Sequence, residues 1–285
     1  MTTVPMSTDM TELPQPPSGY PSRPIVARIW RRAWPLLAAI ALALAIWQLV
    51  YLSGWRPAYV FPGPVTVGQQ LLEMLGGAEL YQSIGTTMQR AVLGFSTAVA
   101  TGTILGVAVA RSRILRAAVG SLITGLQTMP SIAWFPLAIL LFGLSEQAIF
   151  FVVVLGAAPS IANGVISGID DLPPALLRAA RVLGARGLRL YASIVMPAAF
   201  PAYLSGLTQG WAFAWRSLMA GEILVIIGRQ SSLGADLHFA REFSDAPRLM
   251  AVMIVILIIG MVVDSIFNAV ANGVRSRRGL GALRL

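Results

Sequence analysis

The chain has 285 residues, of which 56% are hydrophobic and only 12% charged, with 21 basic residues, 12 acidic residues and no cysteine. An ordinary soluble domain carries about 25% charged residues, so this composition excludes that class. Without cysteine, and with His238 as the one histidine, the chain has no means of forming disulfides, thiolate metal sites or a zinc cluster.

Long apolar runs dominate the sequence. A bilayer core about 30 Å thick requires roughly 20 apolar residues per helix. Runs of that kind lie near residues 33–53, 84–110, 117–143, 147–168, 201–228 and 249–272. No alternating strand pattern competes with them. We therefore predict an all-α polytopic membrane protein with about six transmembrane helices.

The N-terminal third divides into three parts. Residues 1–30 contain the polar, proline-rich LPQPPSGYPSRP and predict a disordered cytoplasmic tail. Residues 31–55 form the first transmembrane helix, which is longer than the apolar region of a signal peptide and lacks a clear cleavage site. Residues 56–83 combine a Pro/Gly turn with a short amphipathic helix, expected on the outer face.

The second and third spans differ in character. Residues 84–110 are rich in glycine, alanine, serine and threonine, which permit close helix packing and predict a central position. The third span is interrupted by Pro130 and Pro136. Proline is tolerated there where neighbouring helices or a cavity satisfy the freed carbonyls. We expect a kinked helix beside a pathway, with a merely bent structural helix as the alternative.

The arginines predict the orientation in the membrane. All 21 basic residues are arginine, and fifteen of them fall in the N-terminal segment, the loops after spans 2 and 4, and the C-terminal segment. The opposite loops hold only Arg56, Arg229, Arg241 and Arg248. By the positive-inside rule the arginine-rich side is cytoplasmic, with both termini inside. The net charge of +9 therefore points to membrane topology and not to nucleic acid.

Residues 170–200, between spans 4 and 5, are too charged to cross lipid. They open with DDLPP, a favourable helix start because acids suit the positive helix end and proline suits the first turn. Gly184 marks a break, and a second amphipathic helix is expected to end at Pro197 and Pro201. One interpretation is an arginine loop resting on anionic lipid.

The order of residues in this loop favours another interpretation. RAARVLGA followed by MPAAFP resembles the EAAxxxGA…LPxxxP loop of ABC-importer permeases, which is their coupling helix and docks in a cleft of the ATPase subunit. The resemblance assigns ATPase coupling to Arg178, Ala179, Ala180, Gly184, Ala185 and Pro197. Arg178 departs from the family's glutamate, and Met196 from its leucine.

The likeness extends over roughly residues 56–272. QTMPSIAWFPLAILLFG, AWRSLMAGEIL and SSLGADLHFAREF resemble segments of nitrate, sulfonate, taurine and bicarbonate permeases, although SDAP then stands where Thr-Asp is usual. The resemblance implies a type I importer core at 84–272, containing the coupling loop at 170–200, and a cytoplasmic C-terminal tail at 273–285.

This resemblance implies a transport subunit and not an enzyme. It predicts ATP-driven, binding-protein-dependent import of a small anion. The preferred substrate is an aliphatic sulfonate or taurine, and nitrate, bicarbonate or a pyrimidine precursor are the alternatives. A Walker A loop needs a lysine, which this chain lacks, so ATP and Mg belong to a separate subunit. The expected partners are a second copy, two ATPase subunits, a periplasmic or lipid-anchored binding protein and membrane lipid, in the bacterial inner membrane.

Two other classes remain as alternatives. An ion-driven secondary transporter would carry inverted repeats and a midplane ion site, and the sequence shows no obvious example of either. A membrane scaffold would use the arginine loop to bind lipid. Only the importer requires a stoichiometric nucleotide-binding partner.

Four charged residues fall within the apolar runs. A charge at the bilayer centre costs at least about 2.5–3.5 kcal/mol, so each is expected to face protein or water. Arg90, Glu222 and Asp264 predict ion pairs that fix helix packing. Arg216 is the best candidate for a position that attracts an anion on the pathway.

Neutral and aromatic residues complete the candidates. Five residues are expected either to line the pathway or to serve helix packing: Gln127, Ser131, Trp134, Asn163 and Trp211. In the outer loop before the last span, His238, Phe239 and Phe243 are candidates for an outer gate or a contact with a binding protein. A plain interfacial helix is the alternative there.

Overall fold

The computed structural model describes residues 25–228 and 230–277, and within these ranges every regular element is a helix. The predictions made for residues 1–24, residue 229 and residues 278–285 lie outside the described residues. The chain divides into two compact units, one ending at Trp55 and the other beginning at Arg56. In the first unit, α1 (Ile25–Leu52) begins earlier than the predicted start at residue 31.

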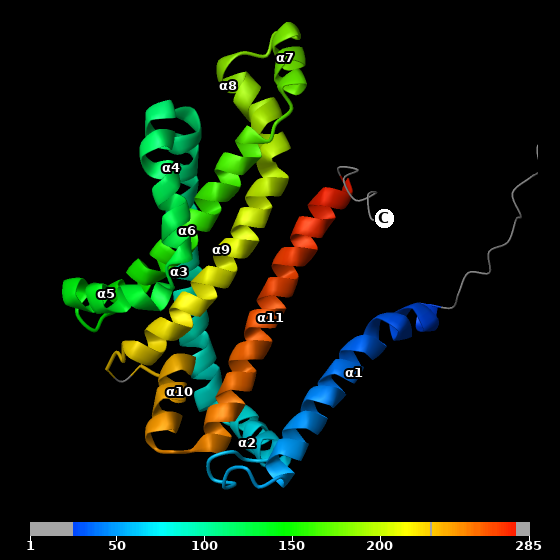
Figure 1. Ribbon diagram of the computed structural model, residues 1–285, viewed down its shortest axis with the longest axis vertical. Coiled ribbons are helices and arrows are strands. Elements are labelled where there is room, and N and C mark those ends of the chain that lie inside the picture. The colour runs from blue at the N-terminus through cyan, green and yellow to red at the C-terminus, as the bar shows by residue number, and fades with distance from the viewer. Residues whose placement is uncertain (1–24, 229, 278–285) are drawn as a thin grey trace, which may run out of the picture. The chain divides into compact units, whose positions relative to one another are not determined.

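The second unit contains the remaining helices (Figure 1). In chain order they are α2 (Pro64–Gly76), α3 (Ala78–Arg111), α4 (Arg113–Thr128), the 3-10 turn η1 (Ser131–Trp134), α5 (Phe135–Phe142), α6 (Glu146–Asp170), α7 (Pro174–Val182), α8 (Gly187–Leu190), the π-helical turn η2 (Tyr191–Val195), α9 (Met196–Leu224), α10 (Leu233–Glu242) and α11 (Ala246–Arg277). The predicted all-α membrane fold is confirmed.

Four helices in the described ranges are long and apolar enough to span a membrane. They are Trp34–Leu52 of α1, α3, α6 and Ala246–Val274 of α11. The bent pair of α4 with Ser131–Phe142 makes a fifth if it counts as one span. α9, with 29 residues, is as long as these helices, but it is not apolar enough to count as a membrane span by the same measure.

The third predicted span is broken, so the expectation of one kinked helix is wrong. α4 ends at Thr128, and the helical segment Ser131–Phe142 leaves it at an angle of 106°. The cause is local, because the residue before a proline avoids the α region. Met129, which precedes Pro130, has extended backbone angles of φ −84° and ψ 127°.

The predicted helix end at Pro197 and Pro201 is also wrong. α8, η2 and α9 follow one another without an intervening loop, and both prolines lie within α9. Pro197 is accommodated because it falls in the first helical turn, where its missing N–H is tolerated. The turn before it is π-helical, with the Met196 N–H donating to the Tyr191 carbonyl. The second half of the loop is therefore the start of α9 and not a separate amphipathic helix.

α6 packs between α3 and α9 at the centre of the second unit. Gly102 and Gly106 of α3 lie against the α6 backbone, which agrees with the central position predicted from the small residues of 84–110. On the other side, a Cβ on Gly206 of α9 would lie 2.8 Å from the Gly164 Cα of α6. Backbone contact of this kind sets how closely the helices approach.

An aromatic cluster fills the core beside these contacts. The Trp211 ring is edge-on to Phe95, with centroids 5.4 Å apart, and stacks with Phe267 at 5.7 Å and Trp215 at 5.9 Å. Trp211 is buried among these rings in the hydrophobic core, and its predicted place on the pathway remains a prediction.

Gly206→Val tests the close approach of α6 and α9. The added side chain must displace backbone, and overpacking of this kind costs typically about 1–3 kcal/mol. We expect a lower midpoint of thermal unfolding in detergent. Gly85→Val is the control, because a Cβ at Gly85 meets nothing within 4 Å. Equal loss in both variants would contradict the packing argument.

Candidate functional site

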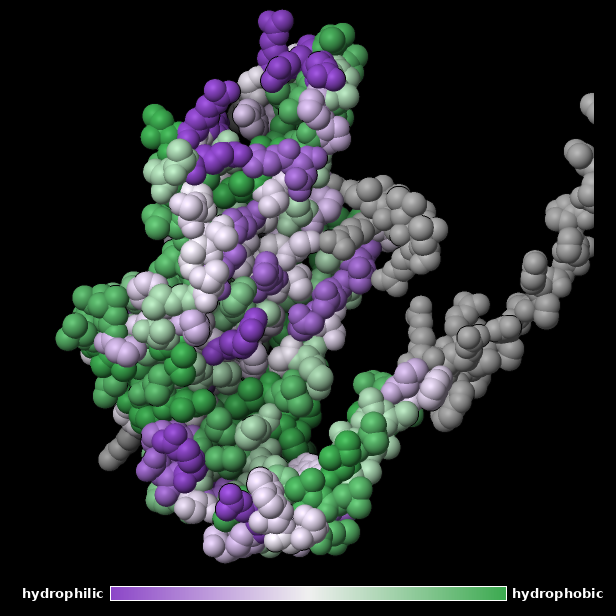
Figure 2. Space-filling view, viewed as in Figure 1, coloured by the Kyte–Doolittle hydropathy of each residue, from purple (hydrophilic) through white to green (hydrophobic). Residues whose placement is uncertain are grey.

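The segment between α6 and α9 projects at one end of the second unit (Figure 1). α7 and α8 lie at this end, whereas α2 and α10 lie at the other. Figure 2 shows hydrophilic surface gathered over α7, α8 and the start of α4. The loop arginines and those after α3 therefore belong to one end of the bundle, as their sequence positions predicted.

A glycine turn ends α7. Gly184 adopts a φ of +83°, and its N–H donates to the Arg181 carbonyl at 3.1 Å. The Ala185 N–H donates to the Ala180 carbonyl at 3.0 Å. This pair of bonds is the Schellman arrangement, which satisfies the last carbonyls of a helix and requires a left-handed residue. A Cβ at Gly184 would meet nothing within 4 Å, so backbone conformation and not space selects glycine here.

Two large apolar side chains stand exposed beside this turn. Val182 is 86% exposed and Leu183 is 87% exposed, whereas Leu172 and Ala180 of the same segment are buried. Adjacent exposed apolar side chains on a polar surface typify a contact with another molecule. We call Ala179, Val182, Leu183 and Gly184 the loop tip. Neither Val182 nor Leu183 was among the predicted coupling residues.

The other predicted coupling residues lie around the loop tip. Arg178 is exposed on α7, and Ala185 is half-buried just after the turn. Pro197 lies beyond η2, within α9, and is exposed. The structure therefore gathers four of the six predicted residues, Ala179, Ala180, Gly184 and Ala185, at one turn.

At the opposite end of the bundle, the interior holds a charged cluster. Arg90 of α3 is 5% exposed, and its Nη1 donates to Glu222 Oε1 of α9 at 3.0 Å. Its Nη2 donates to Glu146 Oε1 of α6 at 2.7 Å and to Gln230 Oε1 at 2.8 Å. One guanidinium thus ties three long helices together, because its planar fork presents several donors at once.

Glu222 also holds the start of α10. Its Oε2 accepts hydrogen bonds from Thr87 Oγ1 at 2.9 Å and from the Gly234 N–H at 3.0 Å, and the Leu233 N–H donates to Thr87 Oγ1 at 3.0 Å. A carboxylate suits a helix N-terminus, where backbone N–H groups lack partners. A Cβ on Gly234 would lie 2.3 Å from Glu222 Cβ, so only glycine fits. The glutamate of AWRSLMAGEIL and the glycine of SSLGADLHFAREF are thus two halves of one contact.

Asp264 does not join this cluster. Its carboxylate accepts a hydrogen bond from Asn268 Nδ2 at 2.9 Å, one turn along α11. The second carboxylate at Arg90 is instead Glu146, the first residue of α6, which was not among the predicted charge partners. The signal that would have identified Glu146 is its position at the start of a long apolar run, where an acidic residue suits the first turn of a helix.

Gln127 and Asn163 lie together on a polar ladder between α4 and α6. Gln127 Nε2 donates to Ser160 Oγ at 3.0 Å, and Asn163 Nδ2 donates to Gln127 Oε1 at 3.1 Å. Ser131 and Trp134 follow in η1, directly after the break, and both are half-buried. The structure therefore brings most of the neutral pathway candidates to the broken third span.

Arg216 is arranged differently. Its side chain is exposed, its Nε donates to the Ala212 carbonyl at 2.9 Å, and its guanidinium lies 4.8 Å from the centre of the Phe213 ring. Both of these contacts lie on α9 itself. Its predicted role in attracting an anion remains a prediction.

Comparison with known proteins identifies the family. Residues 98–276, more than half of the chain, match the family described as the binding-protein-dependent transport system inner membrane component. The chain belongs to this family. It is the permease subunit of a binding-protein-dependent ABC importer, and it is membrane-embedded.

Curated relatives agree with this assignment. The permease is 32% identical to a putative ABC transporter permease of Methanocaldococcus jannaschii, over 79% of this chain and 84% of the relative. It is 29% identical to a putative aliphatic sulfonates transport permease of Bacillus subtilis, over 79% and 80%. It is 27% identical to the taurine transport system permease of Escherichia coli, over 82% and 88%.

A solved structure supports the fold. The permease matches a chain of the MetNI methionine ABC transporter, in an inward-facing conformation, with a TM-score of 0.59 and 18% identity. The match covers 69% of the permease and 96% of that chain. At this identity the likeness concerns the fold alone.

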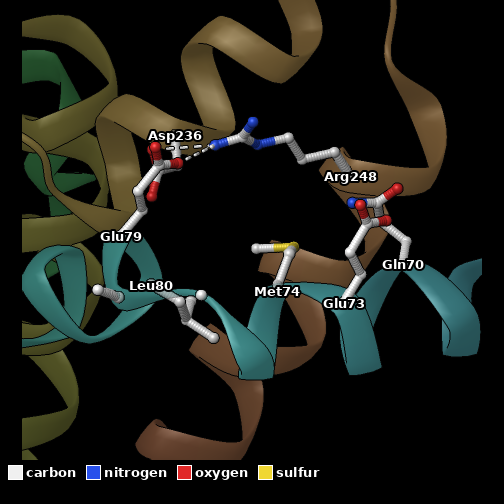
Figure 3. Close-up of a pocket in the computed structure, with 9 residues that line it drawn as sticks. Gln70, Glu73, Met74, Glu79, Leu80, Asp236 and Arg248 are labelled. Atoms are coloured by element: carbon white, nitrogen blue, oxygen red, sulfur yellow. Dashed lines mark ion pairs between the residues drawn. The ribbon is translucent and has the colours of Figure 1, made fainter.

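The end of the permease opposite the loop tip carries a pocket of about 330 Å³ (Figure 3). It lies between α2, the start of α3, α10 and the start of α11, and Glu73, Glu79, Asp236 and Arg248 contribute charged side chains. The Arg248 guanidinium reaches both Glu79 and Asp236 at 3.9 Å. Burial raises the pKa of Asp236, against the opposing effects of a Ser83 hydrogen bond and of Arg248.

His238, Phe239 and Phe243 lie at this same end, on and just after α10. The His238 ring packs edge-on to Phe239 at 5.7 Å, and Phe239 stacks with Phe243 at 6.4 Å. Phe239 and Phe243 are exposed. Their predicted role as a gate or a binding-protein contact remains a prediction beside that of a plain interfacial helix.

Arg90→Met tests the charged cluster. Removing one partner leaves Glu222 buried without its counter-ion, which costs about 3–5 kcal/mol. We expect a large fall in the thermal midpoint of the detergent-solubilised permease. Arg241→Met is the matched control, because the ion pair of Arg241 with Glu242 is exposed and contributes little. A similar small effect in both variants would contradict a structural role for the cluster.

Asp236→Asn tests the pocket. Because the pKa of Asp236 is raised in the folded permease, the folded state keeps this proton to a higher pH than the unfolded chain does. The free energy of unfolding therefore falls as pH rises through that window, and the asparagine variant escapes this loss. We expect the variant to melt above wild type at neutral pH, with a difference that shrinks as pH falls toward the ordinary range of an aspartate pKa. A difference independent of pH would contradict the argument.

Proposed function

We propose that this permease imports a small organic sulfonate, and that separate ATPase subunits drive it through the loop tip. The observation that carries the mechanism is the glycine-capped turn with Val182 and Leu183 almost fully exposed beside it. Burying two such side chains in a partner's cleft is favourable because apolar area leaves water. The left-handed Gly184 ends α7 directly after these two residues, so they lie at the end of the helix.

The loop is well placed to transmit movement. α7 follows α6 after a short connection, and α8 continues through η2 into α9. Displacement of the loop tip would therefore act directly on α6 and α9, the two helices that pack most extensively. The far end of α9 carries Glu222, so the same helix reaches the charged cluster. We infer that the cluster holds the outer ends of α3, α6 and α9 together while the inner end moves, as alternating access requires.

Topology and assembly follow from the same arrangement. The arginine-rich end faces the cytoplasm under the positive-inside rule, which puts the loop tip on the side where ATP is available. The pocket and α10 then face outward, toward a substrate-binding protein, in the inner membrane. Two copies of the permease and two ATPase subunits, which hold ATP and Mg, complete the importer.

The sulfonate assignment is supported by the names of the relatives, which include permeases for aliphatic sulfonates and for taurine. Nitrate, bicarbonate and a pyrimidine precursor are the competing substrates. Proteoliposomes containing the importer and its binding protein distinguish them. We expect labelled taurine uptake to be reduced by excess ethanesulfonate and unaffected by excess nitrate or bicarbonate, and the reverse pattern would refute the sulfonate assignment.

Gly184→Glu tests the coupling. A side chain at a φ of +83° strains the turn, and its charge meets the surface that the ATPase is proposed to contact. We expect loss of uptake and of substrate-stimulated ATP hydrolysis, with membrane insertion unchanged because no neighbouring atom is displaced. Ser276→Glu adds the same charge near the end of α11 and is expected to retain activity. Normal substrate-stimulated ATP hydrolysis in Gly184→Glu would contradict the proposed coupling.

A further inference from the structure

We propose that the oxyanion head of the transported anion binds at the break of the third span, where neutral hydrogen-bond donors hold it and Arg216 does not. This rests on the proposed function. Irregular backbone at membrane depth is tolerated only where it is buried in protein or lines a cavity. At such breaks the N-terminus of the following half-helix presents free N–H groups and a positive dipole end to an anionic group. The segment Ser131–Phe142 begins in this way, at 106° to α4.

A buried hydroxyl without a partner points to the same place. Ser217 of α9 is fully buried, and among the described residues its Oγ has no hydrogen-bond partner. A Cβ on Gly156 of α6 would lie 2.6 Å from Ser217 Oγ and 3.7 Å from Ser131 Cβ. The two serines therefore flank one glycine, beside the start of the half-helix. A buried hydroxyl without a hydrogen-bond partner lowers the stability of the fold, and a ligand oxygen would supply the missing partner.

The polar ladder extends this position along α6. Ser160 lies one turn after Gly156 on the same helix face, and Asn163 lies one turn further. Gln127, near the end of α4, forms hydrogen bonds with both Ser160 and Asn163. These groups are neutral, so attraction of an anion comes from hydroxyl and amide donors and from the helix end. Donors of this kind bind a sulfonate, whose three oxygens accept hydrogen bonds, without the strong hold of a buried cation.

The conformation described here is closed at this position. Even a Cβ at Gly156 would lie only 2.6 Å from Ser217 Oγ, so the anion enters only when α9 and the broken span separate from α6. The proposal therefore predicts that position 217 becomes accessible in one stage of the transport cycle and not in another. Arg216 is the neighbouring residue but lies on the exposed side of α9.

The experiment uses the absence of cysteine from the chain. Ser217→Cys is nearly isosteric and gives the permease chain its one thiol, whose modification is followed on that chain within the complete importer. The probes are two methanethiosulfonates, one carrying a sulfonatoethyl group and one a trimethylammonioethyl group, applied in the resting and vanadate-trapped states. We expect modification in only one state, roughly tenfold or more faster with the anionic reagent, and slowed by excess ethanesulfonate. Ser265→Cys on α11, whose native hydroxyl bonds the Met261 carbonyl, is the control and should show no protection.

The outcomes separate this site from the substrate assignment. A thiol at 217 that resists modification in every state, or that reacts equally with both reagents and without protection, overturns the anion site. Protection by nitrate and not by ethanesulfonate supports the site and overturns the sulfonate assignment. Ser217→Ala gives a second readout, with uptake expected to fall about tenfold and the thermal midpoint unchanged or raised, because the substitution removes an unpartnered buried hydroxyl. Wild-type uptake in that variant overturns the proposal.

Discussion

The buried contact between Arg90 and Glu222 is the constraint on which the rest of the permease depends. A paired charge is stable inside a membrane bundle only if its remaining donors and acceptors are also satisfied. Here Glu146 and Gln230 accept the remaining hydrogen bonds of Arg90. Thr87 and the Gly234 N–H of α10 donate to Glu222. The requirement fixes the relative positions of four helices at one end of the bundle, and it leaves the other end free to change.

The difference between the fixed end and the free end of the bundle suits the transmission of movement along it. α9 runs without a loop from the projecting segment to Glu222, because the π-helical turn before Pro197 accommodates proline without ending the helix. α6 packs along it through glycines, which allow backbone contact but offer little side-chain interlock. A force applied at the loop tip would therefore reach the broken span and Ser217 before it reaches the charged cluster. In the proposed mechanism, the loop tip, the anion site and the charged cluster follow one another along α6 and α9.

Sequence reasoning predicted the elements that depend on short-range chemistry. Long apolar runs located most of the spanning helices, DDLPP located the start of α7, and the arginine pattern grouped the segments after α3 and α6 at one end of the bundle. It failed where the outcome depends on tertiary packing. Glu146 lies beside a loop in the sequence and reaches Arg90 only because α6 and α3 are neighbours. Ser217 has no distinguishing sequence signal, and its significance arises from its contact with Gly156.

Binding of an ATPase subunit to the loop tip can be followed directly by fluorescence. Val182→Cys, labelled with an environment-sensitive fluorophore, places a single reporter on the exposed apolar surface of the purified permease. The account predicts a saturable blue shift when the ATPase subunit is added, reaching its limit at one ATPase per permease, because the fluorophore leaves water. An unchanged spectrum in a complex shown to be assembled would contradict it.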